Sequence, residues 1–169
     1  MAPRSTEYVF LQGKTKWFRY ERPNKFDKWS HELYLTEDSL TKFRNLQMSR
    51  ENAEGIKNDI KKDEDGYYVT ISRPVSRVYN GKATPFSPPT VINKDGVPFK
   101  GDVGNGSDIT TKVEVYRYRV PTGKDKWGTA IRWVSSRIDN LIEFKPQTDY
   151  NPDEQKIIAK LQYQPEQLF

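Results

Sequence analysis

The chain has 169 residues, a length that fits one domain with a tail or a long insertion. Hydrophobic residues make up only 34% of it but aromatic residues 13%, so much of the apolar mass lies in large rings. The absence of cysteine and the single histidine exclude disulfides, thiolate nucleophiles and zinc sites of the Cys/His kind. No apolar run has the length of a membrane span or a signal sequence, so we expect a cytoplasmic protein with no membrane partner and no cofactor.

Charge is distributed unevenly along the sequence. The 28 basic and 23 acidic residues give a net charge of +5. Residues 149–169 contain four acids and two lysines, so they carry −2 and residues 1–148 carry +7. We therefore divide the chain into a basic domain, residues 1–148, and an acidic tail, residues 149–169. A basic domain favours a polyanionic partner, for which an acidic segment can compete.

The first half of the chain predicts two strands followed by a helix. Tyr8 to Tyr20 is a long aromatic run, and Gly13 marks a point where a strand can bulge. Trp29 to Leu35 is the second strand. Thr36 is suited to begin a helix, because its hydroxyl can cap free amides and the acidic residues after it complement the helix dipole. The apolar side of this helix consists of Leu40, Phe43 and Leu46.

The second half predicts three more strands. We expect the charged run Lys61 to Asp65 to be a solvated loop, and Tyr67 to Val75 alternates as a strand does. Residues 76–107 are rich in proline and glycine and predict a long excursion with short extended pieces. Ile109 to Val120 and Trp127 to Phe144 are the last two strands. This count predicts an all-β protein with a minor helix: a five-stranded OB-fold barrel with a helix between strands and a long loop insertion.

Cations and aromatic rings are interleaved repeatedly on or beside these strands. Proteins that bind single-stranded nucleic acid need cations for phosphates and exposed rings for unstacked bases, each stacked base contributing about 1 to 3 kcal/mol. The alternative is that most of the rings are barrel core and the cations ordinary surface charges. The candidate DNA-binding residues are Lys14, Lys16, Trp17, Tyr20, Arg73, Arg77, Tyr79, Tyr116, Tyr118, Lys126 and Trp127.

Alternation along the first strand ranks some of these candidates. If Trp17 is buried, Lys16 and Tyr20 face outward, whereas the reverse arrangement buries two lysines at a high cost. We therefore rank Lys14, Lys16 and Tyr20 above Trp17.

The segment Gly101 to Asp108 is rich in glycine but lacks the lysine and the hydroxyl residue of a phosphate-binding loop. We expect it to have a structural role, in which its glycines permit a sharp entry into the strand at Ile109 and its amides are available to a phosphate.

Acidic residues offer the only enzymatic alternative, a metal-dependent nuclease. The candidates are Asp63, Glu64, Asp65, Asp102 and Asp108. The first three fall in the expected solvated loop, so we expect neither catalytic residues nor a metal site. His31 stands alone on a strand and is expected to be a surface or edge residue.

Several short motifs, taken in order, carry a family resemblance. They are Gly13-Lys14-Thr15-Lys16-Trp17, Phe26-Asp27-Lys28-Trp29-Ser30, Leu33-Tyr34-Leu35 and Val103-Gly104-Asn105-Gly106-Ser107. Over residues 8–146 the chain resembles the single-stranded DNA-binding proteins of tailed bacteriophages. The resemblance implies an OB fold and a non-enzymatic protein of the host cell cytoplasm. Such a protein binds and protects single-stranded DNA, largely without sequence specificity, during phage DNA replication and recombination.

The resemblance also extends to the acidic tail. Many members of that family end in an acidic segment with a terminal aromatic residue, which covers the DNA groove or docks on replication proteins. Glu166 and Phe169 match this pattern, although Asn151 predicts the start of a short C-terminal helix. A homodimer is left open. The rival non-enzymatic function is a protein-protein adaptor or virion-associated component, in which the same rings form a protein interface.

Overall fold

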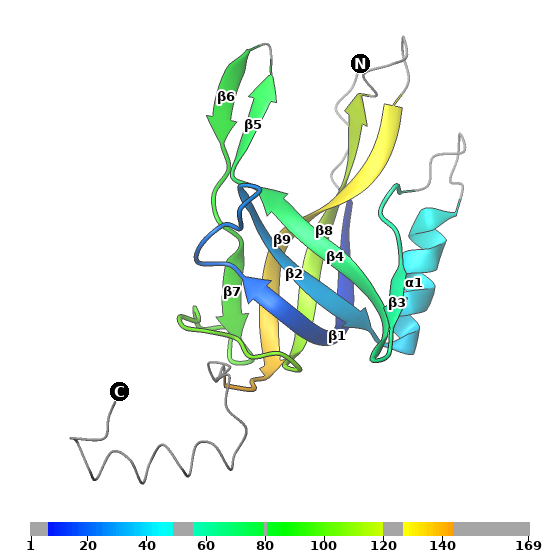
Figure 1. Ribbon diagram of the computed structural model, residues 1–169, viewed down its shortest axis with the longest axis vertical. Coiled ribbons are helices and arrows are strands. Elements are labelled where there is room, and N and C mark those ends of the chain that lie inside the picture. Colours follow the sequence, from blue (N-terminus) through cyan, green and yellow to red (C-terminus); the bar gives the residue numbers. More distant parts are fainter. Residues whose placement is uncertain (1–6, 49–55, 80, 120–126, 144–169) are drawn as a thin grey trace, which may run out of the picture.

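The computed structural model describes residues 7–48, 56–79, 81–119 and 127–143 of the chain, which form a twisted sheet with one flanking helix (Figure 1). The elements are β1 (Glu7–Arg19), β2 (Lys28–Leu35), α1 (Glu37–Gln47), β3 (Lys61–Asp63), β4 (Gly66–Pro74), β5 (Ser76–Tyr79), β6 (Lys82–Pro85), β7 (Thr90–Asn93), β8 (Asp108–Arg119) and β9 (Trp127–Asn140). No helix in these described ranges is long and apolar enough to span a membrane.

The sheet has seven strands in the order β3-β4-β2-β1-β8-β9-β7, and β5 and β6 form a separate hairpin. The five long strands β4, β2, β1, β8 and β9 are the five strands predicted from the sequence. Along the chain, α1 falls between β2 and β4. The OB-type architecture is therefore confirmed. The predicted closure into a barrel is not found: β4 and β9 share no strand ladder, and β7 pairs in parallel with residues 135–138 of β9.

Contacts other than a strand ladder cross the remaining gap between β4 and β9. The Arg73 guanidinium donates a hydrogen bond from Nη1 to the Trp133 carbonyl oxygen at 3.3 Å. Ile56 forms an isolated bridge with Thr129 on the free edge of β9. The structure is thus a sheet curved almost to closure, with single side chains and short segments in place of the last ladder.

Two loop predictions have different outcomes. Residues 76–107 hold only the hairpin β5–β6 and the short strand β7, as predicted. The charged run from Lys61 was predicted to be a solvated loop, and this is wrong for Lys61–Asp63, which forms β3 and pairs with β4. The sequence signal was ambiguous because an exposed edge strand tolerates lysines and acids, and often carries them to prevent further pairing.

Gly13 lies in a regular part of β1 rather than at a bulge. It is paired with Leu35 on β2 and with Ile109 on β8. A Cβ at this position would lie 1.8 Å from the carbonyl oxygen of Tyr34. Glycine is required here because β2 approaches the β1 backbone too closely for any side chain.

The bulge of β1 lies further along, where its register with β2 shifts between Lys16 and Arg19. Trp17 has a φ of 53° there, in the left-handed region. The extra residue reverses the alternation, so Trp17 is 51% exposed whereas Phe18 and Tyr20 are buried. The prediction that Tyr20 faces outward and Trp17 inward is therefore wrong.

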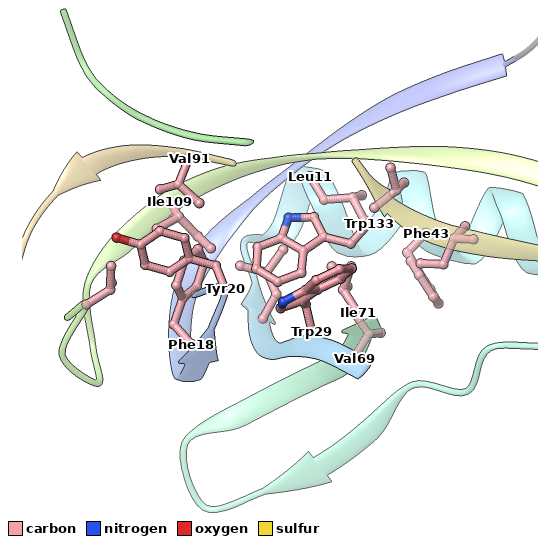
Figure 2. Close-up of a cluster of buried hydrophobic side chains, with 14 of the residues drawn as sticks. Leu11, Phe18, Tyr20, Trp29, Phe43, Val69, Ile71, Val91, Ile109 and Trp133 are labelled. Carbon is pink, nitrogen blue, oxygen red and sulfur yellow. The ribbon is translucent and has the colours of Figure 1, made fainter. Parts of the chain in front are cut away.

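The core lies on the inner face of the curved sheet, and α1 packs against β1 and β2 at one end of it. Figure 2 shows Trp29 and Trp133 in the middle of the core, with Phe18 and Tyr20 toward one end and Phe43 toward the other. The helix begins as predicted, because the Thr36 hydroxyl accepts a hydrogen bond from the Ser39 amide. On its apolar side Phe43 and Leu46 are buried, and Leu40 is half-buried.

His31 lies in this core and not at the surface, so its predicted position is wrong. It is 1% exposed, and its Nδ1 and Nε2 atoms lie 3.3 Å from the hydroxyls of Thr15 and Thr111. Its ring packs edge-on against Trp133 at 4.5 Å. Burial lowers the pKa of His31 to about 3, because the charged imidazolium would lose its hydration. The alternation of β2 contained the signal, since His31 has the same parity as buried Leu33.

This buried histidine predicts a loss of stability in acid. The unfolded chain takes up a proton at His31 below its ordinary pKa of 6.5, whereas the folded chain does so only near 3. The stabilisation from His31 is therefore complete above pH 6.5. Between pH 6.5 and pH 3 it falls by up to about 1.4 kcal/mol per pH unit.

The measurement compares urea unfolding of the wild type and His31→Gln at pH 7, 5.5 and 4.5. The difference in unfolding free energy between the two proteins should shrink as the pH falls. A difference that stays constant over this range would show that His31 is protonated equally in the folded and unfolded chains.

Candidate nucleic-acid interface

Cations and aromatic rings alternate in one continuous row where β4, β8, β9 and the segment after β6 meet. We call it the arginine-aromatic row; its members are Lys57, Arg73, Phe86, Tyr116, Tyr118 and Arg132. The guanidinium carbons of Arg73 and Arg132 lie 4.8 Å and 4.9 Å from the centre of the Phe86 ring. Arg132 also lies 4.0 Å from the centre of the Tyr116 ring. These are cation–π contacts, which hold each charge over a ring face.

The row continues along β8 through the second tyrosine. The ring centres of Tyr116 and Tyr118 are 6.4 Å apart, and the Lys57 ammonium lies 4.4 Å from the centre of the Tyr118 ring. Both tyrosines are half-buried. Four of the six members come from β4 and from the consecutive strands β8 and β9, which lie far from β4 in the sequence, so the fold assembles the row.

Strand register explains why these rings lie on one surface. Tyr116 and Tyr118 have the same parity on β8 and lie opposite Ala130 and Gly128 on β9. The small residues leave room for the rings, and a Cβ at Gly128 would lie 2.2 Å from the Tyr118 ring. Any side chain at residue 128 would therefore displace the Tyr118 ring.

Two arginine charges in the row are held close together with one carboxylate between them. Arg73 donates to the Ser87 carbonyl at 2.7 Å, and Arg132 pairs with Glu114 at 3.8 Å. Burial lowers the pKa of Arg73, the charge of Arg132 lowers it further, and Glu114 opposes the shift. The two guanidinium groups therefore repel each other, and a bound anion would relieve this repulsion.

The row lies between two projections of the molecule. Figure 1 shows the β5–β6 hairpin and the far ends of β8 and β9 extending from the same side of the sheet. Arg73 precedes the hairpin and Phe86 follows it directly, whereas Tyr116 and Arg132 belong to the projecting strands. A chain that binds the row is thus flanked on both sides.

The end of β1 lies near the same end of the sheet. Arg19 is paired with Ser30, and Ser30 with Ser72, so Arg19 is about 10 Å from Ser72 if strands lie about 4.8 Å apart. No carboxylate among the described residues pairs with Arg19. The exposed ring of Trp17 lies two residues away. A cleft of about 470 Å³ opens here, lined by Phe18, Arg19, Tyr20, Glu21, Arg22, Pro23 and Asp102.

Three of the predicted site residues make contacts within the fold instead. Lys14 forms an ion pair with Asp108 at 3.1 Å. Lys16 pairs with Asp65, and this hydrogen bond raises its pKa. Tyr20 is buried and donates its hydroxyl proton to the Gly101 carbonyl at 2.7 Å. The charges of the two lysines are compensated locally, which weakens their attraction for a phosphate.

The other predicted residues are distributed as follows. Arg73, Tyr116 and Tyr118 lie in the arginine-aromatic row. Arg77 is exposed on β5, in the projecting hairpin. The remaining predicted residues fall outside the described residues or side chains; they are Tyr79, Lys126, Trp127, Glu166 and Phe169. The predicted C-terminal helix from Asn151 also lies outside the described residues.

Sequence reasoning left Phe86, Lys57 and Arg132 out of the site. Phe86 stands in a proline-rich stretch without strand alternation, so no pattern indicates that it packs on two arginines. Lys57 precedes β3 and reaches Tyr118 only because its amide is bonded to the Thr129 carbonyl at 2.8 Å. These contacts are tertiary and leave no local signal.

The glycine-rich loop before β8 is structural, as predicted. Its amides at Gly104 and Gly106 donate to the carbonyls of Ile142 and Thr15, each at 2.8 Å, and the Ser107 amide donates to Gly104 at 3.2 Å. A Cβ at Gly104 would lie 2.5 Å from the Ile142 oxygen. Because these three amides are already bonded, they are not available to a phosphate.

Three of the acidic residues considered for a nuclease, Asp63, Asp65 and Asp108, also have partners. Asp63 accepts a hydrogen bond from the Tyr34 hydroxyl, which lowers the pKa of its carboxyl group, and Asp65 pairs with Lys16. Within the ranges that the structure describes, no three His, Asp or Glu side chains are grouped to hold a metal ion. The geometry of these acids is that of fold contacts.

Comparison with known proteins identifies the architecture. No protein-family model and no curated protein matches the sequence. The structure is similar to gp2.5, a single-stranded DNA-binding protein encoded by bacteriophage T7, with a TM-score of 0.62 and 12% identity over 86% of this chain and 92% of that chain. The chain has the fold of phage single-stranded DNA-binding proteins.

A second phage protein supports this assignment. The single-stranded DNA-binding protein from bacteriophage Enc34 matches with a TM-score of 0.52 and 10% identity over 88% of this chain and 89% of that chain. The same protein in complex with single-stranded DNA matches with a TM-score of 0.52 and 10% identity over 80% and 88% of the two chains. At such identities the fold is what is shared, so binding residues must be inferred from the geometry of this chain.

Proposed function

We propose that the protein binds and protects single-stranded DNA, largely without sequence specificity, during phage DNA replication and recombination. It acts in the host cell cytoplasm and is not an enzyme. The observation that carries this proposal is the arginine-aromatic row on a fold of the phage single-stranded DNA-binding type. The proposal includes docking of phage replication proteins on the acidic tail through Glu166 and Phe169, and self-association as a homodimer.

The row supplies the groups that bind the phosphates and bases of a single strand. Arg73, Arg132 and Lys57 present positive charge at intervals, and the rings of Phe86, Tyr116 and Tyr118 lie between them. Phosphates and bases alternate in the same way along an unpaired strand. Stacking on a ring accepts every base because each base has a π face, so this arrangement requires no particular sequence.

Salt dependence tests the proposal. Binding of labelled oligo(dT), followed by fluorescence anisotropy, should weaken linearly with the logarithm of salt concentration, with a slope of about −0.7 for each phosphate neutralised. Arg73→Ala should reduce the steepness of that slope by about 0.7, because one phosphate contact is lost and no carboxylate among the described residues forms an ion pair with Arg73. Lys14→Ala is the matched control, since its charge is compensated by Asp108 and the slope should not change.

Two results would contradict the proposal. Affinity that does not vary with salt would favour a protein-protein adaptor, whose apolar contacts release few counterions. Cleavage of the oligonucleotide in magnesium would favour the nuclease.

A further inference from the structure

Trp17 has a backbone conformation that is unusual for a bulky residue. Its φ of 53° places it in the left-handed region, where bulky residues are true outliers. Regular alternation after buried Thr15 would turn Trp17 into the core, but the bulge turns it outward and leaves it 51% exposed. Bulges re-aim side chains in this way near functional sites. The chain thus accepts a strained backbone and an exposed indole at one residue.

A loop far along the sequence holds this bulge. The Trp17 amide donates to the side-chain oxygen Oδ1 of Asn105 at 2.9 Å. On the residue two positions earlier, the Thr15 amide donates to the Ser107 carbonyl at 2.9 Å and the Thr15 carbonyl accepts from the Gly106 amide at 2.8 Å. Asn105 therefore satisfies the Trp17 amide within the bulge.

The loop is itself fixed to the sheet. The Ser107 hydroxyl donates to the Gly104 carbonyl at 2.8 Å and accepts from the Ile142 amide at 2.8 Å. The Gly104 amide donates to the Ile142 carbonyl at 2.8 Å. The acceptor oxygen of Asn105 is consequently held at a defined position relative to β1.

The surroundings of Trp17 suit a nucleic-acid strand. Arg19 and Arg22 line the cleft at the end of β1 together with Glu21 and Asp102. Arg19 follows Trp17 by two residues, and across β2 it lies near Ser72, next to Arg73 of the arginine-aromatic row. An exposed ring two residues from an arginine that pairs with no described carboxylate repeats the chemistry of the row at a second place on the same end of the sheet.

We propose that Trp17 is a second base-stacking platform and that Asn105 is the positioning residue that holds it outward. This inference rests on the proposed function. If the bulge had only a structural role, glycine or asparagine would fill it without strain, whereas tryptophan is among the least suited residues. Strained residues of this kind persist where the side chain itself is needed.

Two exposed aromatic residues of β1 provide the first test. Trp17→Ala should weaken binding of labelled oligo(dT) about 5- to 100-fold, the effect of losing one stacked base. Phe10→Ala is the matched control, because Phe10 is 53% exposed near the other end of β1, and its affinity should stay within about twofold of wild type. Trp17→Gly should bind as weakly as Trp17→Ala but melt no lower, since glycine takes a positive φ freely.

A double-mutant cycle tests the role of Asn105. Asn105→Ala should weaken binding about 2- to 10-fold, the effect of one lost hydrogen bond, and should cause no further loss in a Trp17→Ala background. Equal losses in both backgrounds would overturn the positioning role, because Asn105 would then act independently of the indole.

The outcomes separate this inference from the proposed function. Wild-type binding with an unchanged affinity in Trp17→Ala would overturn the platform while leaving the proposed function intact. Absence of oligo(dT) binding by the folded wild type would overturn both.

Discussion

Replacing Tyr116 and Tyr118 together by alanine is expected to weaken oligo(dT) binding by at least about 30-fold. Each stacked base contributes about 1 to 3 kcal/mol, so the loss of two platforms costs at least about 2 kcal/mol. Arg132 and Lys57 also lose the rings that hold their charged groups in place. Fluorescence anisotropy at fixed salt measures the affinity, and circular dichroism confirms that the variant is folded.

Tyr67→Ala is the matched control for this double variant. Tyr67 is 37% exposed on β4, and Arg44 and Lys62 lie 5.5 Å and 5.0 Å from its ring centre. It therefore has the same chemistry in a different place. Wild-type affinity in the tyrosine pair variant together with a loss in Tyr67→Ala would move the binding site to the β3–β4 edge.

Local sequence patterns determine most of the fold. Alternation indicated the five long strands, and the Thr36 cap with its acidic first turn indicated the start of α1. These signals are local, because strand parity and helix capping depend on residues close in sequence. The alternation of β2 also indicated that His31 is buried. This signal was missed because histidine is polar and was expected at the surface.

Features that depend on distant segments could not be predicted. The Trp17 amide in the bulge is bonded to Asn105, and β7 pairs in parallel with the edge of β9. One inserted residue reverses the parity of everything after it, which is why Tyr20 was assigned to the wrong face. The partnership of Phe86 with two arginines exists only in the folded chain.

The candidate site illustrates the same division. The sequence indicated that cations and aromatic rings are interleaved on the strands, and Arg73, Tyr116 and Tyr118 do lie in one row. It gave no means to distinguish a free cation from a compensated one, since the partners of Lys14 and Lys16 are far away in the sequence. Charge compensation is a tertiary property, and it decides which lysines and arginines attract a phosphate.

Gly13→Ala is expected to destabilise the protein by more than about 4 kcal/mol, a large part of the stability of a typical domain, which is about 5 to 15 kcal/mol. The new Cβ would lie 1.8 Å from the carbonyl oxygen of Tyr34, and that oxygen belongs to the β2 backbone. Neither strand can yield, because Gly13 is also paired with Ile109 on β8. Urea unfolding followed by tryptophan fluorescence measures the loss, since Trp29 and Trp133 are buried.

Gly66→Ala separates this steric effect from the general effect of removing a glycine. Gly66 has a φ of +124° and no atom within 4 Å of an added Cβ, so its replacement costs only backbone strain, about 1 to 2 kcal/mol. A Gly13→Ala protein as stable as Gly66→Ala would mean that β1 and β2 are further apart than the ladder requires. The β1–β2 ladder continues from Gly13 to the bulge that turns Trp17 outward. A variant whose strands separate at Gly13 should therefore also lose DNA binding.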